Sequence, residues 1–265
     1  MLTLKSLTMT TMLLGSLVAG SLPAHADAYE DIMASGKLRI STDLAILPSG
    51  MLDADLKPIG SDVETAQLLA ADWGLELEFV QTTGATRIPN LQTNKADIVI
   101  STLSVTPERG EVIDFTRAYA ALSSVIGAPA ASDITDWASL KGNAVTVTRG
   151  TTQDSELTAL AATEGFSVTR YDDDATLVTA AISGQAAAVA TSATLVNQIK
   201  QRNLDLSFEP KFTIRTFDLA IGVRKGEPQL VEKLNEWIGT NLANGKLNEI
   251  YLKYHGSPLP AEMLQ

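Results

Sequence analysis

An arginine preceded by a run of hydroxyl side chains is the feature of this sequence best suited to chemistry with a ligand. Residues 101–109 read STLSVTPER and follow Ile98-Val99-Ile100, an apolar run that predicts a buried strand. The Thr-Pro-Glu turn then puts Arg109 at the C-terminal end of that strand. Ligands of open α/β sheets bind at this end, and a planar guanidinium can hold a carboxylate through two parallel hydrogen bonds. The alternative is a surface turn in which Arg109 pairs only with a neighbouring carboxylate such as Asp114.

A second place for an anion is expected where Gly150-Thr151-Thr152 opens a helix that runs to about residue 162. The N–H groups in the first turn of a helix have no partner within the helix, so they favour a negatively charged group. Thr151 and Thr152 are therefore candidate ligand contacts.

Composition removes several classes of function. The chain has 31 Asp and Glu against 20 Lys and Arg, a net charge of −11, which argues against nucleic acid as a partner. It has no cysteine, so disulfides, thiolate metal sites and cysteine nucleophiles are excluded. It has two histidines, His25 and His255, and the first belongs to a segment expected to be removed. We therefore expect no metal and no cofactor, and a Ser-His-Asp triad would depend on His255 alone.

The first 26 residues predict a secretory signal peptide. Lys5 is the only charged residue before Asp27, residues 12–19 are apolar, and Ala24-His25-Ala26 fits the rule for a cleavage site. The alternative is a membrane anchor, but a span needs roughly 20 apolar residues. We expect cleavage after Ala26 and export to the periplasm.

Strand and helix patterns alternate along the rest of the chain, which predicts an α/β fold with a mixed, mostly parallel sheet flanked by helices. They form two series without a flexible linker, so we expect two lobes around a cleft. The predicted strands cover residues 37–43, 75–80, 97–100, 112–115, 121–128, 144–147, 166–171, 186–190 and 219–223. The predicted helices cover residues 62–73, 86–91, 151–162, 175–182, 194–201, 228–244 and 247–254.

Three consecutive aspartates, Asp172-Asp173-Asp174, are expected to form a turn and a helix start. The alternative is a calcium site, but calcium loops use spaced oxygen ligands and a sharp glycine turn. Trp73, Trp137 and Trp237 fall at helical positions and are expected in the core.

Several motifs, taken in order, resemble those of the periplasmic polar-amino-acid-binding proteins of ABC importers, family 3 of the bacterial solute-binding proteins. The resemblance covers nearly all of the chain beyond the signal peptide. The matching motifs are GKLRI (36–40), GSDVE (60–64), RIPNL (87–91), STLSVTPER (101–109), IDFT (113–116), RGTTQD (149–154), IGVRKG (221–226) and NGKL (244–247).

The resemblance implies the two-lobed type II periplasmic-binding-protein fold, with the chain crossing twice between lobes. Lobe one would comprise residues 37–121 plus 217–265, and lobe two residues 126–211. The hinge crossings would lie near residues 121–126 and 211–217, after a signal peptide formed by residues 1–26.

The resemblance also implies roles in the cleft. Arg109 would clamp the α-carboxylate of the ligand, Ser104 and Thr102 would add contacts beside it, and the backbone N–H of Thr152 would contribute from the other lobe. At the position where the family usually carries an aspartate for the ligand's ammonium group, eight residues after Gly184, this chain has Ser192.

The aromatic residues that commonly sandwich the ligand are also absent from their positions. Ile46 and Gly84 stand there instead, so these two positions offer no aromatic ring on which the ligand could stack.

Arg87 bears on the class of ligand. It opens RIPNL, a segment that resembles acidic-amino-acid binders, although it could also be a solvent-exposed arginine at a helix start. If Arg87 and Arg109 both face the cleft, two buried guanidinium groups would require a ligand with a second carboxylate or a strong acceptor.

We therefore expect a non-enzymatic, monomeric binding protein that captures a polar or acidic amino acid and delivers it to the membrane permease of an ABC importer. One alternative is a binding protein for an amine-free dicarboxylate or a related organic acid. Others are a dehydratase-type enzyme on the same fold and the sensing domain of a receptor.

Overall fold

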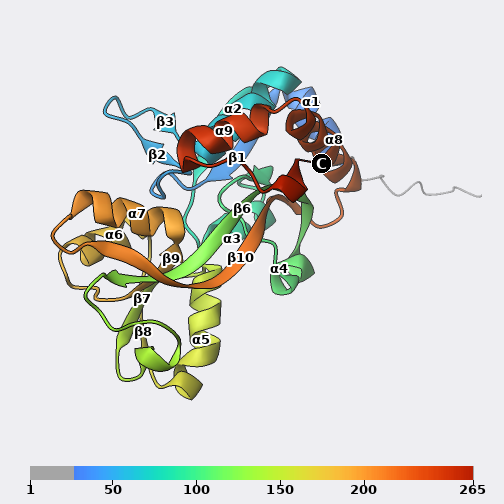
Figure 1. Cartoon of the computed structure of the whole chain (residues 1–265). Coiled ribbons are helices and arrows are strands. Elements are labelled where there is room, and N and C mark those ends of the chain that lie inside the picture. Colours follow the sequence, from blue (N-terminus) through green and yellow to red (C-terminus); the bar gives the residue numbers. More distant parts are fainter. Residues whose placement is uncertain (1–26, 265) are drawn as a thin grey trace, which may run out of the picture.

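The structure is a computed structural model that describes residues 27–264, so the expected signal peptide and its cleavage site lie outside the described residues. It has the predicted α/β fold, with two lobes on either side of a pair of long strands (Figure 1). No helix within this range is both long and apolar enough to cross a membrane.

The two long strands are β6 (Ile113–Pro129) and β10 (Phe208–Arg224). The first lobe contains α1 (Ala28–Ser35), β1 (Lys37–Thr42), β2 (Met51–Leu52), β3 (Pro58–Ile59), α2 (Ser61–Trp73), β4 (Glu76–Gln81), α3 (Arg87–Gln92), β5 (Ile98–Val99), α4 (Pro107–Val112), α8 (Pro228–Ala243), α9 (Lys246–His255) and η2 (Ala261–Met263). The second lobe contains η1 (Ala138–Leu140), β7 (Ala144–Thr148), α5 (Thr152–Glu164), β8 (Ser167–Tyr171), α6 (Asp174–Ile182), β9 (Val189–Ser192) and α7 (Ala193–Arg202).

All but two of the strands form one sheet in the order β4-β1-β5-β10-β6-β9-β7-β8. In the first lobe β1 is parallel to β4 and β5, and in the second lobe β7 is parallel to β8 and β9. The long strands pair antiparallel with each other, with β10 also antiparallel to β5 and β6 antiparallel to β9. This arrangement joins two parallel half-sheets through one antiparallel pair.

The long strands correct part of the prediction. Residues 112–115 and 121–128 were predicted as separate strands but belong to the single strand β6, and β10 begins at Phe208, well before the predicted 219–223. Register shifts interrupt the pairing of β10 with β6 at four places, among them Pro210/Phe212 and Thr213/Arg215. Such bulges break the alternation of inward and outward side chains. A prediction that depends on alternating apolar and polar residues therefore misses the strand.

Two smaller predictions are also corrected. The strand predicted at 186–190 lies later, at Val189–Ser192, and the turn predicted after residue 105 is the short helix α4. The helix α1 was not predicted. The ranges proposed for the hinge, 121–126 and 211–217, fall inside β6 and β10, and the lobe boundaries stay a prediction.

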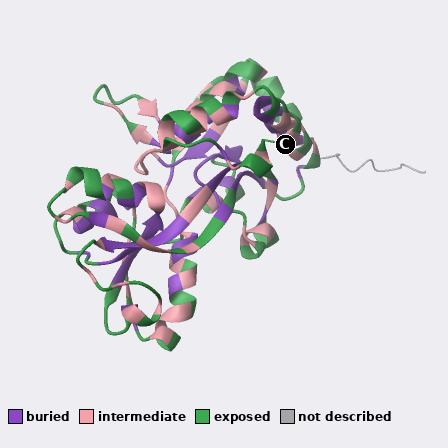
Figure 2. Ribbon diagram, in the orientation of Figure 1, coloured by how far each residue is buried: buried purple, intermediate pink, exposed green. Residues whose placement is uncertain are grey.

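Each lobe has its own buried core. In the first, α1, α2, α8 and α9 cover the sheet, and the apolar stripe of α8 at Leu230, Leu234, Trp237 and Ile238 is buried. In the second, residues from β7, β9 and α5 to α7 form two further clusters. Figure 2 shows the buried residues concentrated along the central strands, with the exposed residues on the outer helices and loops.

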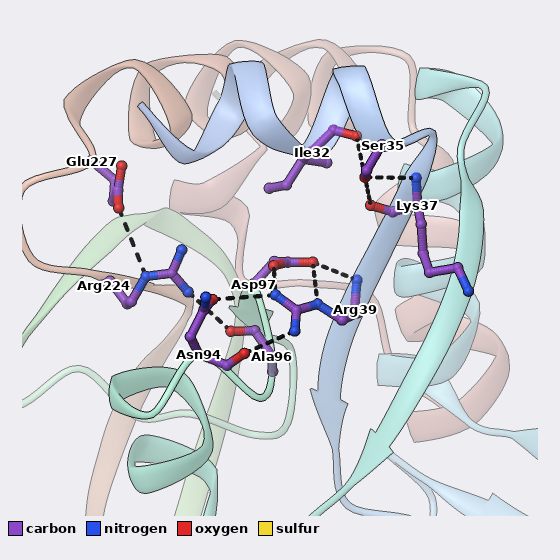
Figure 3. A network of polar contacts seen from close by, with 9 residues as sticks. All are labelled: Ile32, Ser35, Lys37, Arg39, Asn94, Ala96, Asp97, Arg224 and Glu227. Carbon is purple, nitrogen blue, oxygen red and sulfur yellow. Dashed lines mark hydrogen bonds and ion pairs between the residues drawn. The ribbon is translucent and has the colours of Figure 1, made fainter. Parts of the chain in front are cut away.

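A polar network on the outer face of the first lobe ties together segments far apart in sequence (Figure 3). Arg39 on β1 pairs with Asp97 at 2.6 Å. Arg224, the last residue of β10, donates to the carbonyl oxygen of Ala96 and pairs with Glu227 at 3.7 Å. The network therefore links β1, β10 and the loop before β5.

The first described residue caps two helices at once. The Asp27 carboxylate accepts hydrogen bonds from the N–H of Tyr29 in α1 and from the N–H groups of Gln229 and Leu230 in α8. Glu227 in turn accepts from the N–H of Ala28 at 2.7 Å. Because the first N–H groups of a helix have no internal partner, these contacts satisfy both helix ends and hold them together.

We predict that Asp27→Ala lowers the free energy of unfolding by about 2 kcal/mol, since both helices lose their capping acceptor. Denaturant unfolding of the purified protein measures this change. Asp53→Ala is the control, because Asp53 caps only an exposed loop, and it should change the free energy by less than about 0.5 kcal/mol. Equal effects of the two substitutions would refute a role for Asp27 in joining the helices.

Candidate functional site

A small cavity lies between the lobes, and six of the seven predicted ligand-binding residues line it. Its volume is about 30 Å³, enough for about one or two waters. The lining from the first lobe and β6 comprises Asp43, Ile46, Gly84, Arg87, Thr102, Ser104 and Leu122, and that from the second lobe comprises Thr151, Thr152, Gln153, Asp174, Thr191 and Ser192.

The seventh predicted residue, Arg109, does not line this cavity but a second space that shares Thr152 with it. It lines an adjoining cleft of about 750 Å³ together with Gly150 and Thr152. The structure thus brings all seven residues to one region between the lobes, and their contact with a ligand stays a prediction.

Local capping positions Arg109 on the first turns of α4. Thr106 caps this helix through a hydrogen bond from the Arg109 N–H, and Pro107 follows in the first turn, where its lack of an N–H costs nothing. The guanidinium donates to the carbonyl oxygens of Ser104, at 2.9 Å, and Gly150, at 3.3 Å, so it contacts both lobes.

The charge of Arg109 is not paired with a carboxylate. Within residues 27–264 no Asp or Glu lies within 4.0 Å of its guanidinium. Burial, with a smaller contribution from the charge of Arg87, lowers the pKa of Arg109 to about 9. An anion at this position would compensate both effects.

Arg87 is buried and forms hydrogen bonds with the hydroxyl-rich segment, residues 101–109. Its guanidinium donates to the carbonyl oxygens of Ser101 and Thr102, while its Nε has no hydrogen-bond partner among the described residues. Burial lowers its pKa. The solvent-exposed alternative is therefore wrong, because Arg87 faces the cavity.

Asp62 holds the same turn from the other side. Its carboxylate accepts the Thr102 N–H at 2.7 Å and the Tyr119 hydroxyl at 2.8 Å. Thr102 has φ of 43°, a left-handed conformation that costs a non-glycine residue energy and persists only where neighbours enforce it. Asp62 and Arg87 together enforce it.

Hydroxyl groups of the second lobe serve first as caps. Ser192 ends β9 and accepts the N–H of Leu195 as the cap of α7. Thr151 accepts the Asp154 N–H as the cap of α5 and donates to the carbonyl oxygen of Thr148. Thr152 is the first residue of α5, so its N–H has no partner within the helix.

Two buried carboxylates in the cavity were not among the predicted site residues. Asp43 directly follows β1, and its carboxylate accepts the Ala45 N–H at 2.9 Å. Asp174 begins α6 and accepts the Thr148 hydroxyl at 2.6 Å. Burial raises the pKa of both carboxyls, that of Asp174 to about 6.

The rule that selected Arg109 would also have found Asp43, because Asp43 stands at the C-terminal end of a parallel strand. The aspartate triplet was only partly interpreted correctly. Asp173 does cap α6, and Asp172 pairs with Arg149 at 3.1 Å, but Asp174 points into the cavity. Within residues 27–264 no group of three or more metal-binding side chains occurs.

These carboxylates also remove the reason for expecting a second acidic group on the ligand. Asp43, Asp174 and Asp62 each act on Arg87 through their charge, so its guanidinium is compensated by the protein itself. The condition of two uncompensated arginines in the cleft is not met.

The loops that face each other across the cleft touch through their backbones. A Cβ atom on Gly84 would lie 2.9 Å from the carbonyl oxygen of Arg149, and one on Gly150 would lie 2.7 Å from the Cα of Ala85. Real Cβ atoms essentially never approach so closely, so glycine at these positions allows the two lobes to meet. The lobes are closed in this structure.

Comparisons with known proteins give one consistent result. The family model of the bacterial extracellular solute-binding proteins, family 3, matches residues 38–257. The chain is 28% identical to the L-arginine-binding protein of Pseudomonas aeruginosa, covering 91% of this chain and 95% of that protein.

Solved structures agree with this match. The structure of the solute receptor for L-cysteine of Neisseria gonorrhoeae superimposes with a TM-score of 0.81 at 28% identity, covering 90% of this chain and 98% of that one. An ancestral amino-acid-binding protein, described as a precursor of cyclohexadienyl dehydratase, gives a TM-score of 0.78 at 28% identity over 85% and 98% of the two chains.

The raised pKa of Asp174 predicts how its replacement affects stability. The folded protein binds a proton at Asp174 more tightly than the unfolded chain, whose carboxyl has the ordinary pKa of 3.8. This group therefore stabilises the fold least above pH 6 and most below about pH 4. Asp174→Asn should gain stability relative to the wild type as the pH rises from about 4 to 6, and the difference should stay constant above that.

Urea unfolding of both proteins between pH 4 and 8 measures this difference and cancels the contributions of other groups, such as His255. The control is Asp172→Asn, an exposed neighbour in the same loop that pairs with Arg149 and lies outside the cavity. A flat profile for Asp174→Asn would show that this carboxyl has an ordinary pKa in the folded protein.

Proposed function

The chain belongs to family 3 of the bacterial extracellular solute-binding proteins, and from this premise we propose that it is the amino-acid-binding component of an ABC importer. The observation that carries the proposal is the guanidinium of Arg109, which lies between the lobes, contacts both and has no carboxylate partner among the described residues. A small ligand with a carboxylate group would supply the missing charge.

The α-carboxylate of the ligand binds to Arg109 and to the backbone N–H of Thr152 at the start of α5. Thr102 and Ser104 line the first-lobe side of the pocket, and Thr151 lines the second. A cavity of about 30 Å³ is too small for an amino acid, so the lobes open to admit the ligand and close around it.

Closure is a two-state motion that the ligand favours by contacting both lobes. Residues 37–121 plus 217–265 move as one lobe and residues 126–211 as the other, with the long strands bending near 121–126 and 211–217. The closed form then docks, as a monomer in the periplasm, on the membrane permease.

The ligand is a polar amino acid. Two buried aspartates in the cavity, Asp43 and Asp174, oppose a ligand with an additional carboxylate, and they are poorly suited to an amine-free dicarboxylate. The names of the relatives, which refer to binding of arginine or cysteine, support an amino acid as the ligand.

Capture without turnover is the proposed activity. The relatives named above are described as binding proteins or receptors, and the ancestral precursor of a dehydratase is itself described as an amino-acid-binding protein. Addition of the cognate amino acid should raise the midpoint of thermal unfolding, since a ligand that binds the folded state stabilises it. Steady conversion of that amino acid to a product would favour the dehydratase alternative.

We predict that Arg109→Ala lowers the affinity for the amino acid that gives the largest thermal shift by at least about 100-fold, because two charge-assisted hydrogen bonds are worth roughly 3 kcal/mol or more. Calorimetric titration measures the affinity. Arg149→Ala is the matched control, because the backbone of this arginine faces Gly84 of the other lobe while its side chain pairs with Asp172 on the surface. Wild-type affinity for Arg109→Ala would refute the carboxylate clamp.

Gly84 provides a test of closure that leaves the polar contacts intact. Gly84→Ala places a methyl group against the backbone of Arg149 and Gly150 and the side chain of Thr151, which opposes the closed state and should weaken binding roughly tenfold. Gly110→Ala is the control, since a Cβ there meets nothing within 4 Å. Unchanged affinity for Gly84→Ala would mean that ligand binding does not require the contact between these loops.

A further inference from the structure

Asp174 has a free oxygen in the ligand cavity. Thr148 donates its hydroxyl to Oδ1 of this carboxylate, and Oδ2 forms no hydrogen bond with the described residues. The side chain is nonetheless buried, at 4% exposure. Oδ2 is not one of the fully buried atoms that lack a partner, so it reaches the cavity, where a donor group of a ligand can bind it.

The enclosed cavity also has too little positive charge. Its lining contains one arginine, Arg87, against two aspartates, Asp43 and Asp174, and Asp62 lies directly behind it. Nη1 of Arg87 donates to the backbone carbonyl oxygens of Ser101 and Thr102. Among residues 27–264, Arg87 forms no ion pair within 4.0 Å. A cationic group of the ligand would restore the balance.

Thr148 links the Asp174 carboxylate to the expected anion site at the start of α5. It is the last residue of β7, and its carbonyl oxygen accepts the Thr151 hydroxyl at 2.8 Å while its own hydroxyl binds Asp174. Because β7 and β8 are parallel neighbours, the helices α5 and α6 that follow them begin at the same edge of the sheet. The free N–H of Thr152 and the free oxygen of Asp174 therefore belong to adjacent loops, as the two charges of a zwitterion require.

Resting on the function proposed above, we propose that Asp174, and not Ser192, binds the α-ammonium group of the amino acid. Ser192 is engaged as the cap of α7, and a hydroxyl cannot neutralise an ammonium ion. Asp174 supplies both the charge and the free acceptor. The site thereby selects ligands with a primary amine.

The proposal has a consequence for pH. Asp174 faces Arg87 from α3, Asp43 from the end of β1, Thr148 from β7 and its own neighbour Asp173. An ammonium group binds the ionised carboxylate, so protonation of Asp174 competes with the ligand. Affinity should fall as the pH drops below about 6, and Asp174→Asn should remove this dependence.

The test uses wild type, Asp174→Asn and Asp172→Asn, titrated by calorimetry at pH 7.5 and pH 5. The probes are L-arginine, L-glutamine, L-histidine and L-cysteine, followed by the 2-hydroxy acid that corresponds to the tightest of them. At pH 7.5 we expect Asp174→Asn to bind that amino acid at least tenfold more weakly and the hydroxy acid with a change of less than about threefold. Asp172→Asn should bind both as the wild type does.

Each other outcome is decisive. Wild-type affinity of Asp174→Asn for the amino acid, or an equal loss for amino acid and hydroxy acid, overturns the assignment of Asp174. If Arg109→Ala abolishes binding and Asp174→Asn does not, only this assignment fails, whereas failure of all four amino acids to bind the wild type refutes the proposed function as well. If Asp174→Asn does not fold, the test is the ratio of the wild-type affinities for the amino acid and the hydroxy acid. This ratio should fall between pH 7.5 and pH 5. A constant ratio overturns the assignment.

Discussion

The buried guanidinium of Arg87 is the interaction on which the centre of this molecule depends. Its burial must be offset, and three carboxylates from three separate elements act on it: Asp43 after β1, Asp62 in α2 and Asp174 at the start of α6. Asp174 belongs to the second lobe and Arg87 to the first. In this structure an anion of one lobe therefore lies near a cation of the other in a region of low dielectric, where the attraction between them is strong.

The same guanidinium helps to shape the hydroxyl-rich segment. Arg87 binds the carbonyl oxygens of the Ser101-Thr102 turn, and Asp62 binds the Thr102 N–H. Thr102, in its left-handed conformation, lies between β5 and Ser104, which again pairs antiparallel with β10 at Leu219 and accepts a hydrogen bond from Arg109. A residue that contributes charge to the cavity therefore also fixes the backbone of the segment that faces it.

The sequence was sufficient to predict the elements whose signals are local. Strand ends and helix starts identified the segments that carry Arg109 and Thr151, since both rules depend on a few neighbouring residues. The same reasoning did not identify Asp174. The three adjacent aspartates have three different environments: a surface ion pair, a helix cap and a buried cavity. Only the packing of α6 against β7 distinguishes them.

The first half of β10 escaped prediction for a similar reason. Its backbone is extended because it pairs with β6, which lies about 90 residues earlier in the chain, and the bulges in that pairing erase the local alternation. Tertiary pairing, which no local pattern reports, determined this element.

The long strands β6 and β10 connect the two lobes as one continuous hydrogen-bonded pair. A hinge made of loops can lose backbone hydrogen bonds when it moves. A hinge made of two paired strands can bend while the hydrogen bonds between the strands are kept. A bulge bends its strand and increases the local twist. In the proposed closure, the irregular pairing between these strands would let the two lobes pivot without exposing unpaired backbone to water, so one pair of strands would both join the lobes and permit their movement.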